Sequence, residues 1–88
     1  MNQYYIEITD TFGGEANYSW IQRYKIKAKS KKGAMQKLSR STGWNFRYEY
    51  DIPDESFTSR YKVKNNCVCC FISYLDESLN NYDVEVLP

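Results

Sequence analysis

The residues best suited to chemistry in this chain are cations that alternate with uncharged side chains. Arg23, Lys25, Lys27 and Lys29 occupy every second position, and no Asp or Glu occurs from residue 16 to residue 48. Nine of the twelve Lys and Arg residues lie in that acid-free stretch. Alternation with a period of two is typical of a β-strand, so the four cations would share one face while the other face is buried. Such a face suits an anionic partner, either phosphate groups or an acidic protein surface.

A second group of cations begins at an expected helix N-terminus. Ser30 is a suitable N-cap, which places Lys31 and Lys32 in the first turn, where the helix macrodipole disfavours a cation by about 0.3–1 kcal/mol. Cations beside exposed helix N–H groups could hold an anion. We therefore predict a partner-binding surface around the junction of strand and helix, made of Arg23, Lys25, Lys27, Lys29, Lys31, Lys32, Lys37 and Arg40.

Two structural alternatives account for the same cations without a partner. An exposed strand face is often simply solvated, and its lysines protect a sheet edge from aggregation. Lys is also a good helix former, so Lys31 and Lys32 could extend into water from the first turn. The sequence leaves both alternatives open.

The other reactive side chains form no recognisable catalytic or metal-binding pattern. Cys67, Cys69 and Cys70 fall in one strand-like run, and alternation sends Cys70 to the opposite face from the other two. We expect all three to be reduced residues of the core. The chain has no His, which excludes His catalysis and His metal ligands. We therefore predict that the protein is not an enzyme and uses no metal or other cofactor.

Four carboxylates cluster at the end of the expected third strand and just after it, at Glu49, Asp51, Asp54 and Glu55. A catalytic pair can be imagined among them, but charged residues in a turn are the usual explanation. Their expected role is electrostatic, because they give the molecule a negative pole opposite its basic surface and would orient it on a partner.

The length of 88 residues indicates one domain spanning residues 1–88. The chain has no apolar run of membrane-spanning length and no signal-peptide pattern, so we expect a soluble, cytoplasmic protein with no membrane partner. The chain has nine Tyr, four Phe and two Trp, and the nine Tyr exceed the needs of a small core. Some of these rings should therefore lie on a sheet surface, where they could contact a partner or mediate a homodimer.

Local patterns predict an α+β domain, with an antiparallel sheet of four to six strands and one helix packed on one face. The expected element order is ββαβββ. The strands are predicted at Tyr4–Ile8, Tyr18–Lys29, Trp44–Asp51, Thr58–Lys64 and Cys67–Leu75, the helix at Lys31–Ser41 with Gly43 near its C-cap, and Tyr82–Leu87 either adds an edge strand or frays. The run from Cys67 is the most apolar and is expected at the centre of the sheet.

The connection between the first two strands contains Gly13 and Gly14, which suit a turn with positive φ. The polar segment from residue 9 to residue 17 is too long for a two-residue hairpin turn, so we expect a loop that projects and exposes Phe12. In the third strand, alternation predicts Trp44, Phe46, Tyr48 and Tyr50 on one side and Asn45, Arg47, Glu49 and Asp51 on the other.

The run Tyr24-Lys25-Ile26-Lys27-Ala28-Lys29-Ser30, followed by Ala34 and Leu38, resembles small accessory proteins of phages and mobile elements, anti-CRISPR inhibitors among them. The opening Ile-Glu-Ile-Thr-Asp-Thr-Phe-Gly-Gly-Glu-Ala-Asn-Tyr is similar to proteins of the same kind. The resemblance implies a one-helix, antiparallel-sheet protein that works by binding. It implies no functional residue.

The resemblance and the basic surface together predict an anti-CRISPR-like inhibitor, which blocks a host nucleic-acid-processing defence complex in the cytoplasm of a bacterium. Its partner would be a protein or ribonucleoprotein complex, with the cations on acidic protein or on guide-RNA phosphates. The alternative is a module that binds DNA or RNA directly, with the same cations on phosphates and exposed rings stacked on bases.

Overall fold

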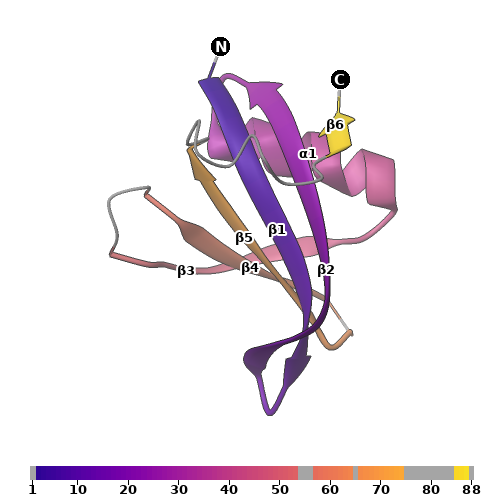
Figure 1. The fold of residues 1–88 in the computed structure, drawn as a ribbon. Helices are drawn as coiled ribbons and strands as arrows, with labels where there is room; N and C mark the ends of the chain where they lie inside the picture. The colour runs from indigo at the N-terminus through magenta and orange to yellow at the C-terminus, as the bar shows by residue number, and fades with distance from the viewer. Residues whose placement is uncertain (1, 54–56, 65, 75–84, 88) are drawn as a thin grey trace.

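The computed structural model describes residues 2–53, 57–64, 66–74 and 85–87. These residues form one helix and six strands, which confirms the α+β class (Figure 1). The elements are β1 (Asn2–Phe12), β2 (Glu15–Ala28), α1 (Lys31–Thr42), β3 (Phe46–Asp51), β4 (Ser59–Val63), β5 (Val68–Tyr74) and β6 (Glu85–Leu87).

The strands form a single twisted sheet with the order β3-β4-β5-β1-β2-β6. Every neighbouring pair is antiparallel except β2 and β6, which run parallel. The predicted order ββαβββ is confirmed, and β6 is the further strand that the sequence left open; residues 82–84 of that prediction lie outside the described residues. As expected, β5 lies inside the sheet, between β4 and β1.

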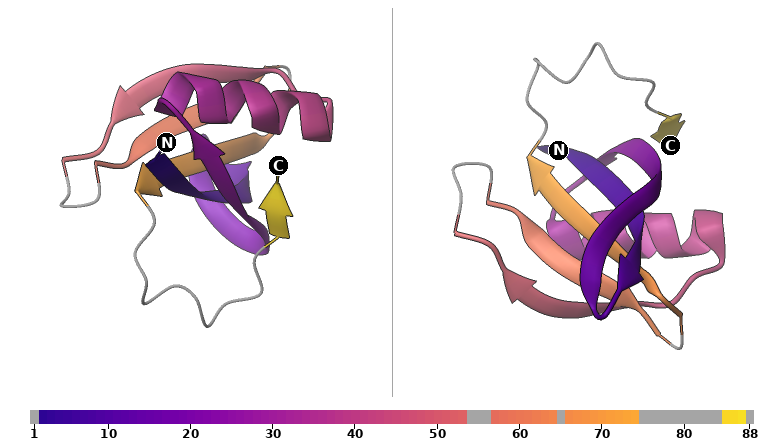
Figure 2. Two further views of the ribbon diagram at one scale, coloured as in Figure 1. Left: turned by 90° about the horizontal axis from the view of Figure 1, so that it is seen from above. Right: turned by 60° about the horizontal axis from the view of Figure 1, so that its bottom comes forward.

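The helix covers one face of this sheet, as Figure 2 shows from above. Its predicted caps are confirmed. The Ser30 hydroxyl accepts a hydrogen bond from the Gly33 amide at 3.1 Å, which satisfies one of the unpaired donors at the helix N-terminus. Gly43 has a φ of 76°, and its amide donates to the Ser39 carbonyl at 2.8 Å. Glycine adopts this left-handed conformation without the steric cost of a Cβ, so α1 ends there.

The main core lies between α1 and the sheet. We call the side of the sheet that α1 covers the helix face, and the other side the open face. Side chains of alternate residues reach the helix face from β1 and β2, and they meet the buried stripe of the helix. The buried apolar side chains of this core are Tyr4, Ile6, Ile8, Tyr24, Ile26, Ala28, Ala34, Met35, Leu38, Val63, Val68, Cys70 and Ile72.

The connection between β1 and β2 is shorter than the loop that the sequence predicted. Phe12 pairs with Glu15, so Gly13 and Gly14 alone form a two-residue turn. Both glycines have positive φ, 62° and 85°, as a tight hairpin turn that follows the strand twist requires. The polar residues on either side were predicted as loop but continue the two strands. Phe12 is 81% exposed, as expected.

The alternation predicted for the third strand is interrupted. β3 begins at Phe46 rather than Trp44, and its register with β4 shifts between Tyr48 and Tyr50. This bulge moves Tyr50 to the open face, where its hydroxyl meets Arg60, and Asp51 to the helix face. Tyr50 and Asp51 were therefore each predicted on the wrong side.

Replacement of Ser30 by Ala tests the helix N-cap. Because the Gly33 amide would lose its acceptor, we expect the free energy of unfolding to fall by about 0.5–2 kcal/mol in urea titrations. The matched control is Ser41→Ala, which removes a hydroxyl from an exposed position in the last turn of α1. Equal losses in the two variants would contradict a capping role.

Candidate functional site

The alternating cations of β2 (Arg23, Lys25 and Lys27), which we call the ladder, project from the open face. Tyr24, Ile26 and Ala28 are buried in the main core, as predicted, so Arg23, Lys25 and Lys27 point the opposite way. The structure adds a carboxylate that the local sequence does not contain, since Glu7 of β1 lies opposite Arg23.

Arg23 and Glu7 form an ion pair, with 3.8 Å between Arg23 Nε and Glu7 Oε2. The neighbouring Tyr5 hydroxyl donates to Glu7 at 3.3 Å. Burial, reinforced by the Glu7 carboxylate, raises the pKa of Tyr5 to about 12. Arg23 therefore belongs to a small polar cluster on the open face, in which its charge is partly compensated.

Lys31 does not extend into water from the helix N-terminus. Its ammonium group crosses to β4 and donates to the Phe57 carbonyl and, at 3.0 Å, to the Ser59 hydroxyl. The Ser59 hydroxyl donates in turn to Asp51 at 2.7 Å. Hydrogen bonds from Ser59 and then Tyr48, together with the charge of Lys31, lower the pKa of Asp51. These acceptors offset the unfavourable position of Lys31 in the helix macrodipole.

The remaining predicted cations lie around the helix. Lys37 was predicted as part of the partner-binding surface but is half-buried, and its ammonium group donates to the Lys27 carbonyl at 2.6 Å. Lys29, Lys32 and Arg40 are exposed. The sheet thus separates the ladder, on the open face, from Lys31 and Lys32, on the helix face. The eight predicted residues border the β2–α1 unit but do not converge on one point at Ser30.

Lys32 borders a groove that sequence reasoning missed. The groove has a volume of about 400 Å³ and runs between α1 and the edge strand β3. Tyr48, 51% exposed, forms an edge-to-face pair with Tyr61, their ring centroids 5.6 Å apart. The alternating aromatic residues of the third strand were the available signal. The lining residues are Lys32, Met35, Gln36, Ser39, Asn45, Phe46, Tyr48 and Tyr61.

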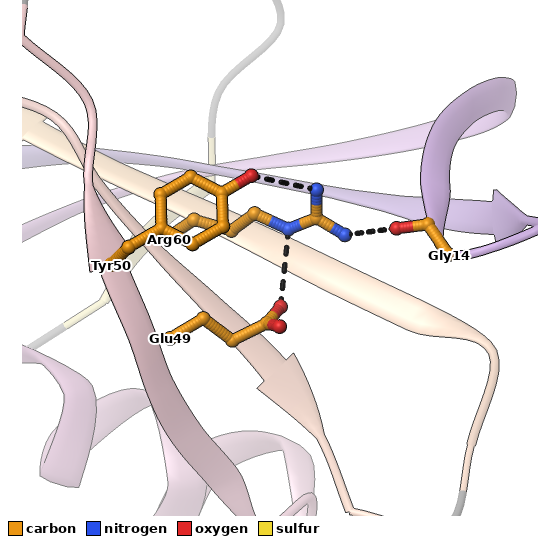
Figure 3. A network of polar contacts seen from close by, with 4 residues as sticks. All are labelled: Gly14, Glu49, Tyr50 and Arg60. Atoms are coloured by element: carbon orange, nitrogen blue, oxygen red, sulfur yellow. Dashed lines mark hydrogen bonds and ion pairs between the residues drawn. The ribbon is translucent and has the colours of Figure 1, made fainter.

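On the open face, a cation outside the predicted set connects three elements. Arg60 of β4 donates to the Tyr50 hydroxyl at 3.1 Å and to the Gly14 carbonyl, and its Nε lies 3.1 Å from Glu49 Oε1 (Figure 3). The guanidinium carbon also lies 5.9 Å from the centre of the Phe71 ring. With its side chain only 11% exposed, Arg60 holds the tip of the β1–β2 hairpin against β3.

Asp10 shapes the part of the hairpin that bends toward Arg60. The register of β1 and β2 slips here, because Thr9 pairs with Ile21 whereas Thr11 pairs with Ala16. The Asp10 carboxylate accepts hydrogen bonds from the Ser19 amide and the Asn17 side-chain amide, both at 2.9 Å, in place of regular sheet bonds. The contacts with Ser19 and then Asn17 hold the pKa of Asp10 well below its ordinary value.

A second buried region forms beneath this bent hairpin. Thr9 and Cys69 are completely buried on the open face, although α1 covers only the helix face. The Tyr18 amide donates to the Thr9 hydroxyl at 3.0 Å, with Tyr18 itself at a φ of 57°. The hairpin therefore folds back over its own sheet, which explains why polar residues of the expected loop are ordered strand.

The cysteine prediction is confirmed for two residues and wrong for one. Cys69 and Cys70 are buried on opposite faces, whereas Cys67 is exposed before β5 begins. All three are reduced. Burial raises the pKa of both buried thiols. Among the described residues, no three Cys, Asp or Glu side chains gather closely enough to hold a metal ion.

The four clustered carboxylates do not act together in the described part of the chain. Glu49 pairs with Arg60 on the open face, and Asp51 meets Ser59 on the helix face. Asp54 and Glu55 lie outside the described residues. Glu49 and Asp51 lie on opposite faces of the sheet because of the bulge in β3.

Comparison of the chain with protein-family models, curated proteins and solved structures found no match. Within the described residues, no helix has the length and apolar character needed to cross a membrane.

Replacement of Arg60 by Gln tests its role in holding the hairpin. Since hydrogen bonds to a charged group contribute about 1.5–3 kcal/mol, we expect the free energy of unfolding to fall by an amount in that range. Amide hydrogen exchange at Gly13 and Gly14 should accelerate more than exchange in α1. Lys62→Gln removes the same charge from an exposed position on the same strand and should neither lower the free energy of unfolding nor accelerate this exchange.

Replacement of Asp10 by Asn tests its carboxylate through the pH dependence of stability. Because the folded-state pKa is lowered, the unfolded chain takes up the proton first, so this contribution is present above about pH 4 and is lost as the pH falls through the folded-state value. Urea titrations should therefore show a less stable variant at neutral pH and a smaller difference in acid. Asn17→Ala, which removes one donor, should give part of the effect. A pH-independent difference would contradict this role.

Proposed function

We propose that the protein is a stoichiometric inhibitor that binds a host nucleic-acid-processing defence complex and blocks its working surface, in the manner of an anti-CRISPR. The observation that carries the proposal is the groove between α1 and β3, which joins an exposed cation to a cluster of aromatic rings. Protein interfaces concentrate their binding energy in such pockets, where aromatic anchors become desolvated.

The charges around the groove favour an acidic partner surface. Lys32 stands on its rim, and Arg40 is exposed on the same helix. Two described carboxylates, Glu7 and Asp51, are positioned against Arg23 and Lys31 and compensate those two cations. The exposed cations would speed association with an acidic partner surface, and the aromatic groove would slow dissociation of that partner.

The groove is supported by fixed backbone on both sides. On one side, α1 is capped at both ends, and Lys31 and Lys37 tie it to Ser59 and to the Lys27 carbonyl. On the other side, β3 pairs with β4 along its length. A surface held in this way loses little conformational freedom on binding, which favours tight association by a small protein.

The test uses bacteria with an active CRISPR system and a plasmid that the system targets. Expression of the wild-type protein should restore plasmid transformation, because an occupied complex cannot cleave its target. Tyr48→Ala and Lys32→Glu should weaken binding to the purified complex roughly 30-fold each, the effect of losing about 2 kcal/mol at a hot spot. Phe12→Ala is the matched control, since Phe12 is an exposed ring at the hairpin tip, far along the chain from the groove.

Two outcomes would contradict the proposal. Wild-type protein that restores no transformation against any of the tested CRISPR types would exclude this mode of inhibition for them. Binding that disappears after nuclease treatment would instead favour the alternative, in which the cations contact nucleic acid directly.

A further inference from the structure

A separate group of cations lies at the opposite edge of the open face, where β3 meets β4. Arg47 of β3 is directly opposite Lys62 of β4, and Lys64, just beyond the end of β4, lines the same pocket as these two cations. Like charges at directly opposed positions destabilise a pair of strands. Among the described residues, none of the three forms an ion pair. We call Arg47, Lys62 and Lys64 the corner cations.

The corner cations line a pocket of about 380 Å³ together with Val63, Asn66 and Cys67. No carboxylate of the described residues lines it. The side-chain oxygen of Asn66 accepts a hydrogen bond from the Cys67 amide at 2.9 Å, which leaves the Asn66 amino group as a donor. The polar side chains of this pocket therefore offer donors and positive charge, which is the chemistry of an anion site.

The pocket differs from its neighbour on the same strand. Arg60 lies two residues before Lys62, but Glu49 compensates its charge and the hairpin occupies its donors. The corner cations have no such internal partner among the described residues. They are also distinct from the eight predicted cations, because β5 and β1 separate β4 from β2.

The arrangement of the cations favours a linear anion over a single small one. Opposed side chains on neighbouring strands start about 5 Å apart, and alternate residues along one strand lie about 7 Å apart. A nucleic-acid strand carries one phosphate for every 3.4 Å or so of helix axis, so it can neutralise several such cations at once.

An exposed ring on the same edge strand favours a single strand over a duplex. The bulge of β3 turns Tyr50 to the open face, three residues beyond Arg47 and so about 10 Å along the strand. Tyr50 is 48% exposed, while its hydroxyl is fixed by Arg60. A positioned aromatic ring beside a cationic track is the arrangement that holds unpaired bases.

We propose that the corner cations bind the phosphate backbone of single-stranded nucleic acid, with Tyr50 as a stacking platform. This inference goes beyond the proposed inhibition, which uses the helix face and a protein partner. It can be tested on the purified protein without any host complex, so its failure would leave the proposed function untouched.

The experiment measures fluorescence anisotropy of labelled oligothymidylate and oligouridylate between about 50 and 200 mM salt. The combined variant Arg47→Gln, Lys62→Gln and Lys64→Gln should lose affinity. Its plot of log K against log salt should also become shallower, with the magnitude of the negative slope reduced by about 2, the value for three phosphate contacts to a single strand. The matched control, Lys25→Gln, Lys27→Gln and Lys29→Gln, removes equal charge from the opposite edge region and should keep the wild-type slope.

Circular dichroism distinguishes lost contacts from lost structure. The corner variant relieves a repulsive pair, so its unfolding temperature should equal or exceed that of the wild type. Wild-type protein that binds neither oligonucleotide at the lowest salt would overturn the proposal. Equal loss of affinity in the corner and control variants would also overturn the proposal, because net charge alone would then account for binding. A blunt-ended duplex that competes as well as the single strand would overturn it too.

Discussion

The interaction on which the described open face depends is the contact of Arg60 with the hairpin tip. One guanidinium group reaches the Gly14 carbonyl, the Tyr50 hydroxyl and the Glu49 carboxylate, and so joins β1–β2 to β3 across the sheet. The slip in register at Asp10 makes this possible, since a regular hairpin would extend past the sheet rather than bend over it. A small chain thereby gains a second buried region, at Thr9 and Cys69, that α1 does not provide.

This constraint gives the two faces different properties. On the helix face, apolar packing against α1 leaves a groove at the β3 edge, where Lys32 and the aromatic rings meet. On the open face, the hairpin and Arg60 occupy the middle of the sheet, and exposed cations remain at its two sides. The bulge in β3 serves both faces, because it supplies Asp51 to Lys31 and Ser59 on one and Tyr50 to Arg60 on the other.

Local features of the fold could be predicted from the sequence, and contacts between distant segments could not. The caps at Ser30 and Gly43 and the buried side of β2 follow from neighbouring residues, and they were predicted correctly. The positions of Tyr50 and Asp51 depend on pairing with β4, so alternation alone assigned them wrongly. The pairing of Arg23 with Glu7 depends on the register of β1, and the corner cations come together only because β4 returns beside β3. The sequence alone therefore shows that residues 16–48 contain no acid, but only the pairing of the strands shows which of their cations are compensated by carboxylates from other elements.

The distribution of uncompensated charge bears on how such a protein could act. If its cations served solubility alone, there would be no reason to place Arg47 against Lys62, since the same charges could be spread at lower electrostatic cost. Arg60, Lys31 and Lys37 are hydrogen-bonded within the described fold and Arg23 is ion-paired with Glu7, whereas Arg47, Lys62 and Lys64 form no ion pair among the described residues. A protein-binding groove on one face and a phosphate-binding corner on the other would let a single small domain engage a ribonucleoprotein through both of its components. Two modest contacts on one rigid body reinforce each other, because the second forms at the high effective concentration that the first creates.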